Sequence, residues 1–251
     1  MKFGDRVNGN NYDARAEFYA RRKKRERKNL IRRLLLIFIT AVVGTSVILL
    51  TVAFIKLFNP TQHDSGFVPW VFGTNVSKKV EKAQNLQMPD FIEKDFIHKH
   101  NTARSGIMLT DIKNIVVHYV GNPNTTAKNN RDYFDKESTT VSSHFIVGLD
   151  GEIIQCLPIY EKSAASNNRN KDTVSIEVCH PDESGKFNNE TYESVIKLCT
   201  FLCYEFNLDF DDVIRHYDIT GKNCPNYYVE NEEEWETFRQ NIKERLKEYG
   251  S

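Results

Sequence analysis

Two histidines and one cysteine are of the residue types that bind a transition metal, although one of the histidines lies far from the other two residues in the chain. His118 lies in an apolar, β-branched run, His216 ends a second such run, and Cys224 follows eight residues later in a loop. Two imidazoles and one thiolate suit Zn²⁺, and three protein ligands leave a fourth coordination position for water. The spacing alone is weak, because a lone strand histidine is more often a core residue and His118 needs a fold to bring it close.

Glu177 lies in a third apolar run and could move protons beside such a metal. Strand alternation over 173–180 places Ser175, Glu177 and Cys179 on one face and three β-branched residues on the other, namely Val174, Ile176 and Val178. A carboxylate in this setting is usually a partly buried structural group. The residues by themselves therefore leave its role open.

Lys222 precedes Cys224 by two residues in the turn Gly-Lys-Asn-Cys-Pro. A lysine in a glycine-containing turn is usually solvent-facing.

Strands and helices must alternate to position these residues. The patterns predict strands at 113–119, 142–149, 151–158, 173–180 and 213–216, and helices at 126–136, 190–206 and 232–249. Asp150-Gly151 between two apolar runs is typical of a hairpin turn. The two longer helices are amphipathic, which indicates that one face of each packs in a core. The predicted fold class is α/β, a single mixed β-sheet flanked by helices.

Four segments carry a resemblance to a known family. In order, they read VVHYVGNPNTTAKNN, VSSHFIVGLDGEIIQCLP, DTVSIEVCH and RHYDITGKNCP. From about residue 112 to 246 the chain resembles the type-2 N-acetylmuramoyl-L-alanine amidases, which include phage endolysin amidases and peptidoglycan recognition proteins. The resemblance implies their fold and hydrolysis of the amide bond between N-acetylmuramic acid and L-alanine in peptidoglycan.

The resemblance also implies roles for the residues described above. Similar amidases hold Zn²⁺ at the positions of His118, His216 and Cys224, with an activated water as nucleophile. They use a glutamate at the position of Glu177 as general base. They point the lysine at the position of Lys222 toward the zinc, where its charge can stabilise an oxyanion.

The chain departs from some relatives directly before His144. Those relatives have a catalytic tyrosine at this place, where this chain has Ser143, so we expect Glu177 to carry proton transfer by itself. Ser143 and His144 are candidate substrate-binding residues. His144 is equally well explained as a satisfied histidine within the sheet.

Two other functions fit the same fold. One is a recognition module that binds peptidoglycan without cutting it; in such proteins the cysteine ligand is typically replaced, so Cys224 favours the enzyme. The other is a membrane-anchored, wall-associated interaction protein. We also expect the substrate cleft to be less acidic than the domain around it.

The N-terminal part of the chain predicts a membrane anchor. Residues 34–55 form a run of 22 residues without a charge, about the length that spans a ~30 Å hydrocarbon layer. We assign a transmembrane helix to 34–56. A cleaved signal peptide is the alternative, but its apolar region is usually only about 7–15 residues long.

The charges around this run predict its orientation. Residues 1–33 contain twelve Lys/Arg and four Asp/Glu, a net charge of +8 in a chain whose total is zero. The positive-inside rule places this basic segment in the cytoplasm and the rest outside the cell. We predict membrane lipid as a partner of the helix, a possible cytoplasmic partner for the basic segment, and no nucleic-acid partner.

The predicted domains are a basic cytoplasmic segment at 1–33, the transmembrane helix at 34–56, an extracellular linker at 57–90 and a zinc amidase domain at 91–251. Of the cysteines outside the metal set, Cys199 and Cys203 stand one helical turn apart and pair poorly in a regular helix. We expect buried free thiols, with a Cys156–Cys179 bridge as the alternative. His98 and His100 are expected to face solvent.

Overall fold

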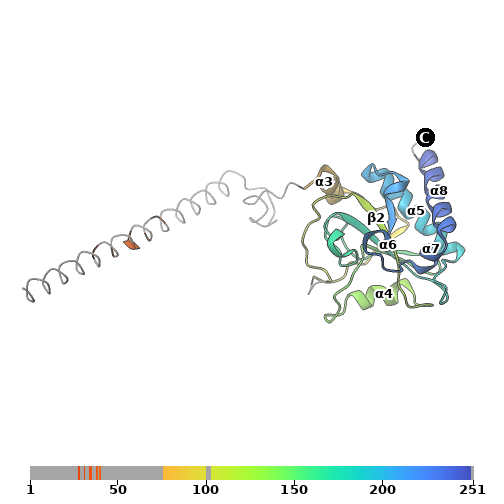
Figure 1. Ribbon diagram of the computed structural model, residues 1–251, viewed down its shortest axis with the longest axis horizontal. Helices are drawn as coiled ribbons and strands as arrows, with labels where there is room; N and C mark the ends of the chain where they lie inside the picture. The colour runs from red at the N-terminus through yellow and green to blue at the C-terminus, as the bar shows by residue number, and fades with distance from the viewer. Residues whose placement is uncertain are drawn as a thin grey trace, which may run out of the picture. The chain divides into compact units, whose positions relative to one another are not determined.

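The computed structural model describes residues 76–99 and 103–249, together with six isolated helical positions between 28 and 40 (Figure 1). Residues 76–99 and 103–249 form one mixed β-sheet with helices on both faces. The fold class predicted from the sequence is therefore confirmed.

The sheet has six strands in the order β1-β4-β3-β5-β2-β6. Strands β3, β5, β2 and β6 pair in parallel, whereas β4 is antiparallel to β3 and parallel to β1. The strand bounds are β1 Ile92–Lys94, β2 Asn114–Tyr119, β3 Phe145–Val147, β4 Ile153–Gln155, β5 Thr173–Val178 and β6 Val213–Arg215. The adjacent parallel strands β5 and β2 are both interior strands, flanked by β3 on one side and β6 on the other.

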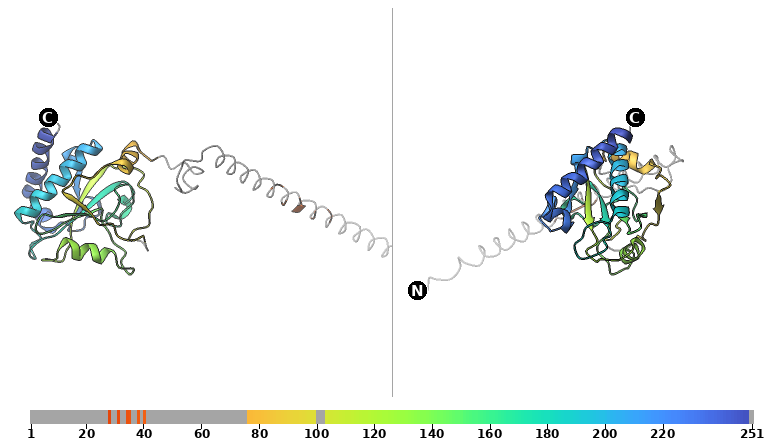
Figure 2. Two further views of the ribbon diagram at one scale, coloured as in Figure 1. Left: turned by 180° about the vertical axis from the view of Figure 1, so that it is seen from behind. Right: turned by 90° about the vertical axis from the view of Figure 1, so that its right-hand side faces the viewer.

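Helices cover both faces of this sheet. Figures 1 and 2 show α5 and α8 side by side on one side of the sheet and α4 apart from them. The helix bounds are α3 Lys78–Asn85, α4 Ala127–Phe134, α5 Asn189–Phe206, α6 His216–Thr220, α7 Asn226–Glu230 and α8 Glu232–Tyr249, with 3₁₀ turns η1 Asn167–Arg169 and η2 Phe210–Asp212.

Strand alternation divides the core between the two faces. Val117 of β2 and Ile176 of β5 pack in the larger cluster, together with apolar residues of α5 and α8. Ile146 of β3 packs in a smaller cluster with Ala127 and Phe134 of α4. Residues of β2 and β5 that alternate with the larger cluster therefore point to the face opposite α5.

Side-chain caps fix where the longer helices begin. Thr126 and Asn129 form a reciprocal capping box at the start of α4, and the Asn188 side chain accepts from the Thr191 N–H at the start of α5. Helix α5 ends at Asn207, whose φ of 48° is left-handed. Such caps satisfy backbone groups that a helix end leaves unpaired.

The strongly patterned elements were predicted correctly, including the hairpin between β3 and β4 and the buried faces of α5 and α8. The sequence analysis missed β1, α3, α6 and α7. These elements have only three to eight residues each, fewer than a periodic pattern needs to be recognised.

Helix α3 lies within the segment 57–90, for which the sequence predicts a linker. Its Val80 and Ala83 are buried in the larger core cluster, so the packed unit includes this part of the segment. An eight-residue helix of mostly polar residues gives little sequence signal, and only tertiary contacts identify it.

Most of the N-terminal predictions fall outside the described residues. This holds for the basic segment 1–33 and the predicted span 34–56, apart from the six isolated positions named above. Within the part of the chain that the structure does describe, no helix has both the length and the apolar character needed to cross a bilayer.

Candidate active site

The pairing of β2 with β5 brings His118 and Glu177 together. They occupy directly opposite positions in the register of these parallel strands. Because Val117 and Ile176 face the larger core, His118 and Glu177 point to the other face, as the alternation in the sequence predicts. Both lie near the carboxyl ends of their strands.

The next strand, β6, brings the second histidine. His216 is the first residue of α6, directly after β6, whereas the sequence analysis placed it at the end of the strand. Arg215 anchors this junction, since its guanidinium group contacts the carboxylates of Asp218 at 2.9 Å and Glu232 at 2.6 Å. Helix α6 ends at Gly221, whose φ of 74° turns the chain back toward Cys224.

His118, His216 and Cys224 form one cluster of possible metal ligands. One donor atom from each lies within 4.8 Å of the others, and all three residues are buried. The Nδ1 atom of His118 is 3.9 Å from Cys224 Sγ, and the two imidazole rings are 4.6 Å apart. Tetrahedral zinc bonds of about 2.0–2.3 Å place donors ~3.3–3.8 Å apart, so this set fits Zn²⁺ after small adjustments.

Burial and charge disfavour proton binding by both histidines. Burial, the neighbouring His216 and Lys222 hold the pKa of His118 well below its usual value. Burial and Lys222 lower the pKa of His216 as well. Neutral imidazoles are the form that binds metals, and His216 Nδ1 is buried with no hydrogen-bond partner in the described part of the chain.

The acidic members of the site are held in their protonated forms. Burial raises the pKa of Glu177 to about 8, although the Lys222 charge opposes this shift. Burial and the nearby Glu177 raise the pKa of Cys224 to about 12. A divalent cation would reverse these shifts by favouring thiolate and carboxylate, so the donor set fits a metal electrostatically as well as geometrically.

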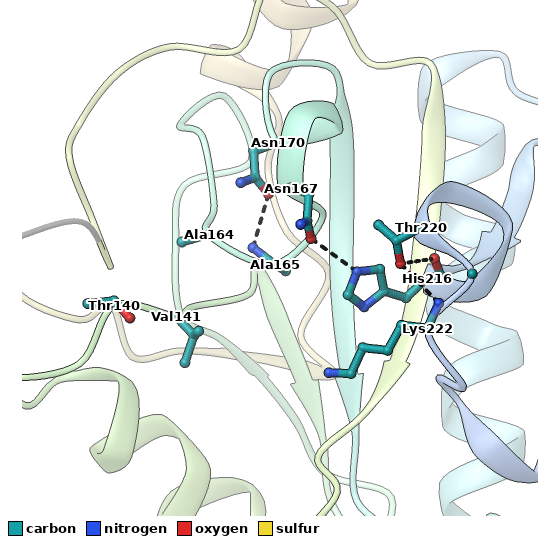
Figure 3. A pocket seen from close by; sticks show the side chains of 10 residues that line it. Thr140, Val141, Ala164, Ala165, Asn167, Asn170, His216, Thr220 and Lys222 are labelled. Carbon is teal, nitrogen blue, oxygen red and sulfur yellow. Dashed lines mark hydrogen bonds between the residues drawn. The ribbon is translucent and has the colours of Figure 1, made fainter.

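A cleft of about 640 Å³ opens beside His216. In Figure 3, Thr140 and Val141 lie across the cleft from His216 and Thr220, and the Lys222 side chain extends into the space between them. Among described residues, those that line the cleft include Lys222 and no carboxylate.

Ser143 and His144 do not reach this cleft. Both are fully buried, and the Ser143 hydroxyl donates to the Phe145 carbonyl at 2.7 Å. The His144 Nδ1 atom accepts from the Ser175 N–H at 3.0 Å, and Nε2 donates to the Glu161 carbonyl at 2.8 Å. His144 is thus a satisfied sheet histidine, and direct substrate contact, the other interpretation, does not fit this geometry.

The remaining cysteines and His98 behave as the sequence suggests. All five cysteines are free and buried, with no Cys156–Cys179 bridge. His98 is exposed, and its ring contacts the Asp135 carboxylate at 3.0 Å. His100 lies outside the described residues.

The sequence analysis missed the wall of the site formed by Ser166 and Asn167. Ser166 Oγ is 3.4 Å from His118 Nε2, and Asn167 Oδ1 is 3.3 Å from His216 Nε2. In the sequence, Ser-Asn-Asn-Arg-Asn indicates only a polar loop. No local sequence pattern predicts that this loop contacts histidines that are 48 and 49 residues away in the chain.

A mixed sheet with a buried His-His-Cys cluster beside its interior strands is typical of a metal-dependent hydrolase. Residues 108–227 match the family described as N-acetylmuramoyl-L-alanine amidase (Amidase_2). Over these residues the chain is similar to the type-2 amidases, as its sequence motifs predicted.

Particular relatives come from Bacillus. The N-acetylmuramoyl-L-alanine amidase BlyA of Bacillus subtilis strain 168 is 31% identical over 172 residues, which cover 60% of this chain and 46% of BlyA. CwlL of Bacillus licheniformis is 27% identical, with 62% and 47% covered. The chain thus spans about half the length of the curated relatives it matches.

Solved structures share the fold of this domain. A mutant endolysin from Bacillus subtilis is 28% identical, with a TM-score of 0.53 over 60% of this chain and 97% of that one. The catalytic domain of XlyA is 27% identical, with a TM-score of 0.53 over 60% of this chain and 98% of that domain.

Proposed function

We propose that this protein is a zinc-dependent N-acetylmuramoyl-L-alanine amidase. It hydrolyses the amide bond between the lactyl carbonyl of N-acetylmuramic acid and the L-alanine of the stem peptide in peptidoglycan. The observation that carries this proposal is the juxtaposition of the His118, His216 and Cys224 donors with the Glu177 carboxyl group. The names of the related amidases support the same bond as the target.

His118, His216 and Cys224 would hold the zinc ion, which leaves one coordination position for water or substrate. When bound, zinc supplies Lewis-acid polarisation of the scissile carbonyl and lowers the pKa of water toward ~7. The protein's contribution is to keep the imidazoles neutral and the donors fixed in a buried site.

Glu177 is the general base in this proposal. Its Oε2 atom is buried and lacks a hydrogen-bond partner among the described residues. Once a bound cation favours the carboxylate form, this oxygen is free to accept a proton from the attacking water. The carboxyl group then returns the proton to the leaving nitrogen. Ser143 is buried and bonded to the backbone, which is consistent with Glu177 transferring protons by itself.

Lys222 is the proposed electrophilic residue. Its side chain extends into the cleft beside His216 (Figure 3). An ammonium group at this place stabilises the negative charge that develops on the carbonyl oxygen as water attacks.

Membrane anchoring by residues 34–56 is part of the proposal. Its support is the long uncharged run and the excess of basic residues before it. The anchor would keep the amidase domain outside the cell, close to the inner surface of the wall. Membrane fractionation combined with protease digestion of intact cells tests this; a domain that resists protease until lysis would contradict the orientation.

The identity of the broken bond tests the enzymatic proposal. The purified full chain is incubated with peptidoglycan, and the soluble products are analysed by mass spectrometry. We expect stem peptides with a free L-alanine amino group and glycan chains without peptide. Binding to peptidoglycan with no product would instead indicate a recognition module.

A further inference from the structure

Two consecutive residues approach the two imidazoles of the candidate metal site from outside. Ser166 Oγ is 3.4 Å from His118 Nε2, and Asn167 Oδ1 is 3.3 Å from His216 Nε2. In His118 the other ring nitrogen, Nδ1, contacts Cys224 Sγ, and in His216 the other ring nitrogen is buried without a partner in the described part of the chain. Both contacts are long for hydrogen bonds.

The Asn167 contact selects one tautomer of His216. An amide oxygen can only accept a hydrogen bond, so the Nε2 atom of His216 must carry the hydrogen. The Nδ1 atom then has a bare lone pair, and this atom is buried without a partner in the described part of the chain. The arrangement prepares Nδ1 as a metal ligand before any metal arrives.

The Ser166 contact orients the His118 ring without selecting its tautomer, because a hydroxyl can either donate or accept a hydrogen bond. His118 Nδ1 faces Cys224 Sγ at 3.9 Å, and Nε2 on the other side of the ring meets the serine hydroxyl. Ser166 and His118 are 0% and 2% exposed, so no bulk water can take the place of this hydroxyl. Asn167, in contrast, is exposed at the cleft, where water can partly replace it.

The loop that carries both residues is held independently of the histidines. Asn170 Oδ1 accepts from the N–H groups of Ala165 at 3.0 Å and Ser166 at 2.6 Å; the first of these bonds is drawn in Figure 3. Asn167 has a left-handed φ of 52°, which asparagine and glycine adopt more readily than other residues. The two oxygens are therefore placed by the loop itself.

We propose that Ser166 and Asn167 are positioning residues that orient both histidines, and that Asn167 also fixes His216 in the tautomer with a bare Nδ1 atom. This inference rests on the zinc centre of the proposed function. Residues that hold metal-binding histidines in this way typically contribute 10- to 100-fold to metal affinity. Ser166 should contribute more than Asn167, because it is buried.

The test measures zinc affinity of the full chain by competition with a chromophoric chelator. We expect Ser166→Ala to weaken zinc binding by roughly 10- to 100-fold and Asn167→Gly by about 10-fold or less. Glycine keeps the left-handed backbone, so this variant removes only the amide. Asn167→Asp keeps an acceptor oxygen and should bind zinc at least as tightly as the wild type.

The matched control is Asn207→Gly, the same change at another left-handed asparagine, at the exposed end of α5. It should leave zinc affinity unchanged. As a readout independent of the metal, long-range ¹H–¹⁵N spectra of the chelated protein should show a protonated Nε2 in His216. Asn167→Gly should mix the two tautomers.

Two results would overturn the inference. One is unchanged zinc affinity in both Ser166→Ala and Asn167→Gly. The other is a lower Tm of the chelated variants together with wild-type affinity of their folded fraction, which would indicate a purely structural role. If the wild type itself binds no zinc, the proposed function fails instead, so the two failures are distinguishable.

Discussion

At the scale of single residues, Glu177 and His118 are neighbours across the pairing of β2 with β5. Glu177 is half-buried, and its Oε2 atom is buried without a hydrogen-bond partner among described residues. A structural carboxyl group in this position would be expected to have hydrogen-bond partners. Its isolation is better explained by a function with a transferred proton.

We predict that Glu177→Gln lowers the hydrolysis rate by roughly 10²- to 10⁴-fold, because glutamine has the same shape but cannot accept the proton. Zinc content, measured by atomic emission on the same samples, should not change. A rate within a few-fold of the wild type would assign proton transfer to another group.

Lys222 permits a separate test of charge stabilisation. Replacement by Met keeps the length of the side chain and removes its charge, and we expect kcat to fall by at most about 100-fold, since this exposed lysine acts in a wet cleft. Steady-state kinetics with a soluble muramyl peptide separates kcat from KM. An effect confined to KM would mean that Lys222 only binds substrate.

At the scale of elements, helix α8 packs against α5 through an aromatic cluster. The Phe238 ring is fully buried and stacks on Trp235, with 5.0 Å between the ring centroids. It also packs edge to face with Tyr192 of α5, at a centroid distance of 5.5 Å. This cluster fixes the face of the domain opposite the site, and Arg215 links it to the site through its contact with Glu232 of α8.

Truncating this ring should cost much of the domain's stability. We expect Phe238→Ala to lower the free energy of unfolding by about 3–5 kcal/mol, because a large cavity replaces the ring. Denaturant titration of the wild type and the variant measures the change. Lys247→Ala, an exposed change on the same helix, should alter stability by about 0.5 kcal/mol or less.

The elements also explain which features the sequence could predict. Runs such as that around His118 and the amphipathic pattern of α5 extend over six to eighteen residues, enough to identify a strand or helix. Helix α6 has five residues, and its start at His216 depends on the Arg215 network rather than on a local pattern.

The candidate site was predictable in part, because some of its residues stand in recognisable motifs. The ligands and Glu177 stand in motifs that resemble a family, so their residue types could be interpreted together. His144 stands in such a motif as well, but only the structure shows that Ser175 and Glu161 occupy both of its ring nitrogens. Ser166 and Asn167 stand in no motif, and three-dimensional proximity alone reveals them.

At the scale of the whole molecule, buried histidines make folding depend on pH. Burial lowers the pKa of His144 to about 4, below the value of about 6.5 in an unfolded chain. Between these values the unfolded chain binds more protons, so stability is complete above pH ~6.5 and falls as the pH drops toward 4. The loss from this residue is of the order of 3 kcal/mol.

Denaturant titrations of chelated protein between pH 4 and 7 check this prediction. His144→Gln should be less stable than the wild type at pH 7, and the difference between them should narrow as the pH falls. A difference that stays constant across this range would show that His144 does not titrate as its burial predicts.

The charge distribution along the chain is uneven. The first 33 residues carry a net charge of +8 and the remainder carries −8. With the proposed anchor at 34–56, the amidase domain would reach only the wall close to its own membrane. This arrangement suits local remodelling better than the action of a diffusible lysin.

The central claim is that the His-His-Cys cluster holds the zinc of an amidase. The most direct measurement is the rate at which the full chain releases L-alanine amino groups from peptidoglycan, alongside new reducing sugar ends, before chelation, after chelation and after zinc is restored. We predict amino groups without sugar ends, loss of their release on chelation, and its recovery with zinc. Release that continues in the chelated protein, or the appearance of sugar ends, would contradict the account.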